Sequence, residues 1–335
     1  MEMHFTNEPT SERRAFLKNS AVATVAIPLV SQWSQARDAD PIAIGIIGVG
    51  GMGMSHLKQL ARRTDTSIAY VCDVDRIRLQ NALKTVQEIS GKSPKAVTDL
   101  REILSDEKVQ AVFIATPDHW HAPAAILSLN AGKHVYVEKP CCHNLREGQL
   151  LQDAVEKSGK VLQVGTQSRS TGFVREAIDR LHRGAIGKIL VAKAWNSQRR
   201  GSIGHEQPSD PPAELDFDTW LGPAEKVAYR KNLLHGVWRW WHDFGCGDMG
   251  NDGIHDIDVA LWGLDTVRGV SKATNADIVA GRLSAAVVHL ANIAARVGRV
   301  LSYDSATHKI IGDLEANRLV QRKYRDGHWS IPSGA

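Results

Sequence analysis

The sequence predicts an α/β fold built on a doubly wound parallel sheet. Short runs of continuous apolar residues recur after residue 40, helical stretches of about ten to fifteen residues separate them, and a glycine-rich turn joins the first run to the first helix. Continuous apolar strands are typical of a sheet with helices on both faces, since both sides of such a strand are buried. We expect this domain over residues 41–165 and a second α/β domain over residues 166–335.

The elements follow in order along the chain. The expected strands lie at residues 41–50, 67–75, 110–117, 133–140 and 160–167, and the helices between them at residues 51–63, 76–90, 122–132 and 144–159. Beyond these, the pattern predicts a helix at 173–184, a strand at 188–197, and helices at 247–264 and 276–299. Residues 199–245 are rich in Gly, Pro, Trp and charge, and so long an irregular stretch is uncommon unless it covers a site.

The bulk composition is that of a globular protein without a nucleic-acid partner. With 335 residues the chain can bury a sizeable core, and its net charge of +4 is small for this length. The positive residues form no long basic run interleaved with aromatics. The four cysteines have neither CxxC spacing nor metal-ligand spacing with histidine, so we expect no metal site, and nothing in the sequence requires a disulfide.

Residues 1–36 have the pattern of an export signal. Arg13 and Arg14 precede an apolar stretch, Ala21–Val30, that is too short to span a bilayer, and Ser34 and Ala36 offer small residues for cleavage. The pattern resembles a twin-arginine signal, which would carry the folded protein to the periplasm without a stable membrane span. A basic amphipathic leader that stays in place is the alternative.

The glycine-rich turn at residues 48–53 predicts the dinucleotide site of a Rossmann domain. Glycines there let the chain turn tightly, let a pyrophosphate approach the backbone, and let the helix pack on the strand. Asp73 ends the next strand, where a carboxylate would bind the adenosine ribose and favour NAD, while Arg76 nearby leaves NADP possible. An ordinary tight turn is the alternative. The cofactor residues expected here are Gly48, Gly50, Gly51, Met52, Gly53 and Asp73.

Polar residues also follow the third strand, in the sequence ATPDHWHAP. The carboxyl ends of parallel strands border the ligand crevice of a doubly wound sheet. We therefore expect Thr116, Pro117 and His121 to lie near a bound dinucleotide. For His119 and Trp120, packing at the start of a helix is the better supported interpretation.

Glu138 and Lys139 stand side by side at the end of the fourth strand, and Pro140 holds the lysine extended. A lysine amine beside a positively charged nicotinamide loses its proton more readily, which suits a general base that takes a hydroxyl proton. Glu138 could orient the lysine or bind the nicotinamide ribose. A salt bridge at a strand end is the alternative, and without further context it is the better supported one.

The motifs GIIGVGGMG, CDVD, ATPDHWHA, GKHVYVEKP and VGTQSRS follow one another in this order, and GDMGNDGIHDID comes later. Together they closely resemble the Gfo/Idh/MocA oxidoreductases, the glucose–fructose oxidoreductase and inositol dehydrogenase family, from about residue 41 to the end. The resemblance implies a Rossmann domain, a second α/β domain with a large open sheet, and oxidation or reduction of sugars and polyols with NAD(P). It also implies that Lys139 and His255 are catalytic, that Gln167 lies near the nicotinamide and that Arg169 binds substrate.

Two departures from the family pattern matter. Family members typically carry an Asp four residues before the active-site histidine, whereas Asn251 stands here with Asp252 beside it. We expect both residues to contact the substrate and proton transfer to depend more on Lys139. Near residues 270–275 the chain lacks most of the segment that builds the family's second sheet, so we expect a shortened second domain with two to four strands. We also expect this domain to expose an apolar helical face that a partner could bury. A homo-oligomer stays open, although the shortening calls the usual sheet interface into question.

Three functions stay open on this reading. The first is an NAD(P)-dependent sugar or polyol dehydrogenase in which Lys139 takes the proton. The second is a glycoside-cleaving enzyme whose retained NAD oxidises a sugar transiently so that the glycosidic bond breaks by elimination. An exported protein has no ready supply of free NAD, which favours a retained cofactor. The third is a nucleotide-binding protein without catalytic activity.

Overall fold

The computed structural model describes residues 40–265 and 274–335, and Asp40–Ala335 cluster into one compact unit. The predicted export signal at residues 1–36 lies outside the described residues, as does most of the junction at residues 270–275. The predictions of export and of a missing segment at this junction therefore stay predictions.

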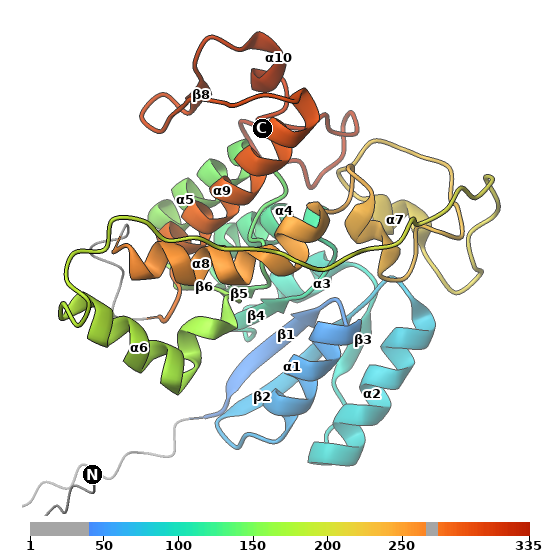
Figure 1. Cartoon of the computed structure of the whole chain (residues 1–335). Helices are drawn as coiled ribbons and strands as arrows, with labels where there is room; N and C mark the ends of the chain where they lie inside the picture. The colour runs from blue at the N-terminus through green and yellow to red at the C-terminus, as the bar shows by residue number, and fades with distance from the viewer. Residues whose placement is uncertain (1–39, 266–273) are drawn as a thin grey trace, which may run out of the picture. The chain divides into compact units, whose positions relative to one another are not determined.

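Six parallel strands form the central sheet, in the order β3-β2-β1-β4-β5-β6. The strands are β1 Ile42–Ile47, β2 Thr66–Cys72, β3 Lys95–Val97, β4 Ala111–Ile114, β5 His134–Val137 and β6 Leu162–Val164. Neighbouring residues of β1 point to opposite faces, so Ile46 packs in a core with α1 and α2 while Ile47 packs in a larger core with α4 and α5 (Figure 1). The predicted doubly wound sheet is confirmed.

The helices that cover the sheet are α1 Gly51–Ala61, α2 Arg76–Ser90, α3 Leu100–Ser105, α4 Asp118–Asn130 and α5 Leu145–Ser158. Asp75 caps α2 and Asn144 caps α5, each by accepting hydrogen bonds from amides of the first turn. α4 begins four residues before the expected start at Ala122. The sequence interpretation missed β3 and α3, because an edge strand of three residues with Lys95 and Ala96 exposed has no apolar run to reveal it.

The remaining elements follow β6. They are the 3-10 turns η2 Gln167–Ser170 and η3 Val237–Trp240, the π-helical turn η4 Met249–Gly253, the helices α6 Gly172–His182, α7 Phe217–Leu221, α8 Ile254–Gly263, α9 Ile278–Val297 and α10 Leu314–Asn317, and the strands β7 Tyr303–Asp304 and β8 Lys309–Ile310. The helices predicted at 173–184, 247–264 and 276–299 are confirmed. In the described part of this region, the sheet consists of the antiparallel pair β7–β8.

The strand predicted at residues 188–197 is wrong. Its apolar residues Leu190, Val191 and Trp195 are 77%, 69% and 73% exposed. An apolar run becomes a strand only when a neighbouring strand satisfies its backbone groups. Among the described residues no strand pairs with this segment, so it follows the surface without regular structure.

α9 is the long apolar helix of the second part, and it packs against α5 and α8 (Figure 1). By length and composition, α9 is also the one helix among the described residues that could cross a membrane. Ala285 and Val288 of α9 are fully buried within the protein, as in the core helix of a soluble domain. The composition of α9 is therefore weak evidence for a membrane span.

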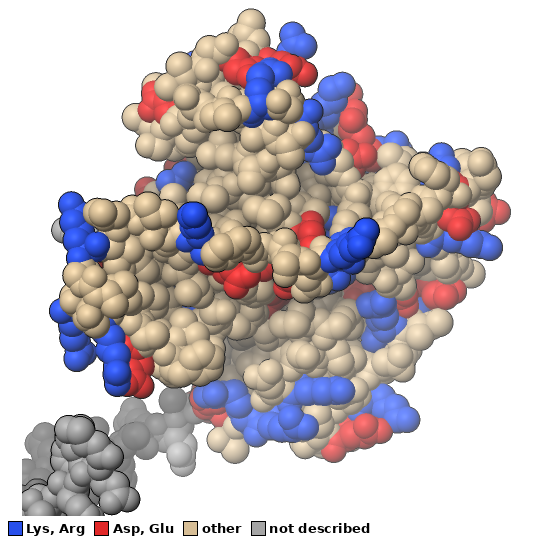
Figure 2. Space-filling model, viewed as in Figure 1, with Lys and Arg blue, Asp and Glu red and all other residues tan. Residues whose placement is uncertain are grey.

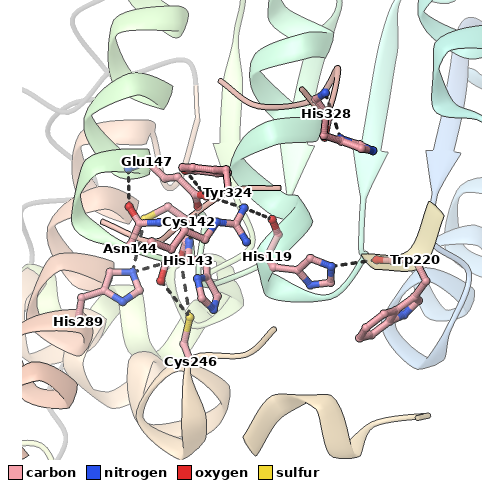
Figure 3. A network of polar contacts seen from close by, with 12 residues as sticks. His119, Cys142, His143, Asn144, Glu147, Trp220, Cys246, His289, Tyr324 and His328 are labelled. Atoms are coloured by element: carbon pink, nitrogen blue, oxygen red, sulfur yellow. Dashed lines mark hydrogen bonds and ion pairs between the residues drawn. The ribbon is translucent and has the colours of Figure 1, made fainter. Parts of the chain in front are cut away.

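A buried polar network ties the segment after α10 to α4 and α5 (Figure 3). Glu147 of α5 is fully buried, and its Oε1 accepts hydrogen bonds from Arg322 Nη2 and from the Tyr324 hydroxyl, both at 2.8 Å. The same Nη2 of Arg322 donates to the His119 carbonyl oxygen at 2.7 Å, and the His119 ring lies beside Trp220. The network therefore fixes residues 322–324 against the helices that border the sheet.

Two buried histidines should make stability depend on pH. Burial lowers the pKa of His119 to about 3, helped by the charge of Arg322, and burial lowers the pKa of His289 to about 4. Both rings are neutral in the folded protein but take a proton in the unfolded chain below about pH 6.5. We expect the free energy of unfolding to fall by about 1.4 kcal/mol per pH unit for each histidine as the pH drops from about 6.5 toward these values.

Urea unfolding at about pH 7, 5.5 and 4.5 measures this slope. The variant His289→Gln keeps a donor for the Cys142 carbonyl oxygen, which His289 Nε2 now reaches at 3.2 Å, but cannot take a proton. Its slope should be shallower than that of the wild type. An unchanged slope would contradict the assignment of His289.

Candidate cofactor and substrate site

A cavity of about 350 Å³ lies at the carboxyl ends of β1, β2, β4 and β5. The opposite wall comes from the segment that the sequence indicated as a cover, residues 199–245, together with Asn251 and Trp329. Backbone hydrogen bonds hold this wall in place: the Arg76 amide donates to the Glu214 carbonyl oxygen and the Asp216 amide to the Val74 carbonyl oxygen, both at 3.0 Å. Polar groups at strand ends and an irregular covering segment thus enclose one crevice, as in other doubly wound sheets. Figure 2 shows acidic and basic side chains distributed among other residues over one face of the molecule.

The glycine turn fits a pyrophosphate. Gly48 has φ +83°, and a Cβ there would lie 2.8 Å from the Ala115 carbonyl oxygen, so only glycine fits. A Cβ on Gly53 would lie 1.9 Å from the Gly48 carbonyl oxygen, which explains the close contact of turn and helix. No side chain caps the start of α1, so its first amides are free to bind an anion. Four of the five predicted turn residues line the cavity: Gly48, Gly50, Gly51 and Met52.

Asp73 lies where an adenosine ribose would bind. Its Oδ2 accepts a hydrogen bond from the Val49 amide at 2.8 Å and its Oδ1 from the Asp75 amide at 2.9 Å. Burial raises the pKa of this carboxyl, against the opposing effect of the two amides. The sequence pointed to Arg76 as a nearby cation, but Arg78 rather than Arg76 lines the cavity on this side.

Thr116 and Pro117 follow β4 and His121 lies in the first turn of α4, and all three line the cavity. The two ring nitrogens of His121 lie 2.9 Å from the Thr116 carbonyl oxygen and 2.7 Å from the Pro140 carbonyl oxygen. His121 therefore joins the two strand ends. The Thr116 hydroxyl is buried without a hydrogen-bond partner within the described ranges, which leaves it available to a ligand.

Glu138 is buried at the cavity wall and bonds to groups other than the lysine side chain. Its Oε1 accepts hydrogen bonds from His56 Nε2 and from Gln167 Nε2, both at 2.8 Å. Burial is the largest effect and would raise the pKa of this carboxyl, but the hydrogen bond from His56 and the charges of His56 and Lys139 together lower it. Gln167 lies behind Glu138 rather than at the cavity surface.

Lys139 lines the cavity, half-buried, and its Nζ donates to the Asn251 carbonyl oxygen at 2.6 Å. In the described part of the chain, no ion pair joins its side chain to Glu138, so the salt-bridge alternative at the strand end is wrong. Asn251 belongs to the π-helical turn η4, a geometry that frequently marks functional sites. The structure thus brings Lys139 and Asn251 together from positions 112 residues apart.

Three other predicted residues lie outside the cavity lining. His255 is half-buried in the first turn of α8, and burial, followed by the charge of Lys139, lowers its pKa. Asp252 accepts a hydrogen bond from Gln198 at the surface. Arg169 is buried and makes two hydrogen bonds to Asp258, at 2.8 and 3.1 Å.

Sequence reasoning missed Arg239, which lines the cavity next to Asn251. Its Nε donates to Asn251 Oδ1 at 2.9 Å, and its guanidinium lies 4.4 Å from the ring centroid of Trp238. Burial lowers the pKa of this arginine, and no carboxylate lies within ion-pair distance of it among the described residues. The sequence VWRWW within residues 199–245 was the available signal, because it combines a cation with aromatic residues in the covering segment.

Comparisons with known proteins identify the two domains. A family model described as an oxidoreductase family with an NAD-binding Rossmann fold matches residues 42–166. The companion model, the family's C-terminal alpha/beta domain, matches residues 192–278 and 264–331. The two models together cover most of the chain.

Curated relatives include a Glycosyl hydrolase family 109 protein of Shewanella baltica (strain OS195), which is 29% identical over 166 residues, and one of Shewanella sp. (strain W3-18-1), which is 28% identical over 166 residues. Each match covers 48% of this chain but only 36% of the relative, so the chain spans about a third of these proteins.

Similar solved structures include a levoglucosan dehydrogenase in complex with NADH, with 24% identity over 66% of this chain and 53% of that chain and a TM-score of 0.48. A scyllo-inositol dehydrogenase from Lactobacillus casei with bound NAD(H) and scyllo-inositol has 24% identity over 66% of this chain and 56% of that chain, also with a TM-score of 0.48. On the two matching domain models, the chain belongs to the Gfo/Idh/MocA oxidoreductase family.

Proposed function

We propose that this protein is an NAD(P)-dependent oxidoreductase that acts on a hydroxyl group of a sugar or polyol. The observation that carries the proposal is the position of Lys139, whose amine lies in the same cavity as the glycine turn and the ribose-binding position of Asp73. A proton acceptor and a dinucleotide cradle in one crevice are what hydroxyl oxidation requires.

Residues at successive positions along the cavity have different roles in this proposal. The free amides at the start of α1 would hold the pyrophosphate, and Asp73 the adenosine ribose. A nicotinamide held there would supply the hydride acceptor. Lys139 takes the hydroxyl proton, Asn251 Oδ1 and Arg239 orient the substrate hydroxyls, and the carbonyl oxygen of Asn251 holds the lysine amine in place. His255, whose pKa is lowered first by burial, would assist from the first turn of α8.

Glycoside cleavage with a retained cofactor is the second candidate. It is supported by the covering wall, because residues 214–216 bond to residues 74–76 across the mouth of the cavity and would slow release of a bound dinucleotide. The name of the curated relatives, Glycosyl hydrolase family 109, points the same way. A third candidate is a nucleotide-binding protein without activity, and the small β7–β8 sheet in the described part of the second region is the observation that favours it.

Purification without added cofactor separates the candidates. Absorbance and fluorescence of the protein report bound NAD(H), and a panel of sugars, polyols and aryl glycosides is then offered with NAD and with NADP. Accumulation of reduced cofactor supports the dehydrogenase. Release of the aglycone without net reduction supports glycoside cleavage, and a bound cofactor with neither reaction supports the inactive protein.

Asp73→Asn should weaken NAD binding by about tenfold, because a hydrogen bond to a charged acceptor becomes one to a neutral acceptor. NADP binding should weaken less or improve, since a repulsive charge near the 2′-phosphate is removed while Arg78 remains. Calorimetric titration with each dinucleotide measures the ratio. Asp65→Asn, at an exposed ion pair outside the cavity, is the matched control. Equal loss of both cofactors would contradict the assignment of Asp73 to the ribose.

A further inference from the structure

We propose that Trp329 forms the outer wall of the adenine pocket and makes an aromatic contact with the purine ring of the cofactor. The inference rests on the proposed function, in that it requires the cavity to bind a dinucleotide. Trp329 lies in the segment after α10, far in sequence from the Rossmann domain, yet it lines the same cavity as the glycine turn.

The position of the adenine follows from the order of groups along the cavity. The pyrophosphate belongs at the start of α1 and the adenosine ribose at Asp73, so the base must lie beyond Asp73, away from Lys139. The cavity residues on that side are Thr98, Asp99 and Leu100, which connect β3 to α3. A base that enters there meets the first turn of α3.

Trp329 is held against that turn. The guanidinium of Arg101, the residue after Leu100, lies 4.4 Å from the centroid of the Trp329 ring. The ring of Trp120 also lies beside it, 5.9 Å from that of Trp329 at an interplanar angle of 47°. Trp120 is itself fixed, because its Nε1 donates to the Trp220 carbonyl oxygen at 3.0 Å.

Trp329 is also partly exposed, at 37%, although two aromatic neighbours and a cation contact it. A purine bound beside Asp99 and Leu100 would remove part of this indole surface from water. Contacts between a nucleic-acid base and an aromatic side chain are strong enough to change affinity by about tenfold. The buried network of Arg322, Tyr324 and Glu147 anchors the chain shortly before Trp329, so the ring is positioned before the ligand arrives (Figure 3).

The test uses ADP-ribose, which carries the adenine half of the dinucleotide and cannot be turned over. Titration calorimetry on the full chain should show that Trp329→Ala raises the Kd for ADP-ribose about tenfold, whereas Trp329→Phe stays close to the wild type because an aromatic ring remains. Trp195→Ala is the matched control, since Trp195 is 73% exposed and does not line the cavity. Circular dichroism and thermal unfolding check that each variant keeps the wild-type fold.

An unchanged Kd in a folded Trp329→Ala protein would overturn the inference, as would an equal effect of Trp195→Ala. A loss of affinity that Trp329→Phe does not restore would also overturn it, because the contact would then not be aromatic. If the wild type binds neither ADP-ribose nor NAD, the proposed function itself fails. If the wild type and the Trp329→Ala protein bind ADP-ribose equally well, only the inference about Trp329 fails.

Discussion

Lys139→Ala should lower kcat by about 10² to 10⁴-fold on the sugar or polyol that the panel identifies, while NAD still binds. The amine lies in the cavity, 2.6 Å from the Asn251 carbonyl oxygen. Among the described residues no other lysine lines the cavity, so none could take the hydroxyl proton in its place. Cofactor affinity should change little, because the cradle at α1 and Asp73 is untouched. Steady-state kinetics and calorimetric titration with NAD measure the two effects separately.

A rescue experiment tests the chemical role of the amine. Small primary amines added to Lys139→Ala should restore part of the lost rate if the side chain acts as a base, whereas a purely structural lysine would not be replaced in this way. Asn251→Ala is the comparison, since it removes the side chain but leaves the carbonyl oxygen that holds the amine. Its kcat should fall less than that of Lys139→Ala. Full activity of the lysine variant would remove Lys139 from the mechanism.

The part of this site that follows from local sequence is the part built at strand ends. Apolar runs predict the strands, and parallel strands bring their carboxyl ends to one edge, so the sequence alone places Gly48, Asp73, Thr116 and Lys139 at one crevice. It does not predict their hydrogen-bond partners. The partner of Lys139 is a backbone carbonyl oxygen of a π-helical turn, and no side-chain pattern encodes a backbone partner so far away in the chain.

The opposite wall shows the same limit. Residues 199–245 could be recognised as a cover because this segment is long and irregular. The sequence does not predict that Arg239 in this segment bonds to Asn251. Trp329 gave no signal, since a single tryptophan beyond the last helix is ordinary in sequence. The strand at residues 188–197 was predicted wrongly for a related reason. A strand forms only beside a neighbouring strand, and the apolar pattern of a segment does not show whether that neighbouring strand exists.

Asp258→Ala should lower the free energy of unfolding by about 3–5 kcal/mol, the largest stability effect we expect for a single substitution here. Asp258 is fully buried, and its carboxylate accepts two hydrogen bonds from Arg169 and one from the Ser284 hydroxyl, at 2.7 Å. Arg169 is also buried, with its guanidinium 5.0 Å from the ring centroid of Trp262. Removal of the acid leaves this cation without compensation in a medium of low dielectric.

Urea unfolding and steady-state kinetics of three variants together decide whether Arg169 serves the fold or the substrate. Glu176→Ala, in the exposed Arg180–Glu176 pair of α6, is the matched control and should leave stability within experimental error. The double variant Arg169→Met, Asp258→Leu removes both charges, so it should recover most of the stability that Asp258→Ala loses. If the double variant folds and keeps its kcat/KM, Arg169 acts through the fold alone. If it folds but loses kcat/KM, Arg169 contacts the substrate, as the family resemblance implies. A buried pair that only stabilises the fold can be replaced by apolar residues without an effect on turnover.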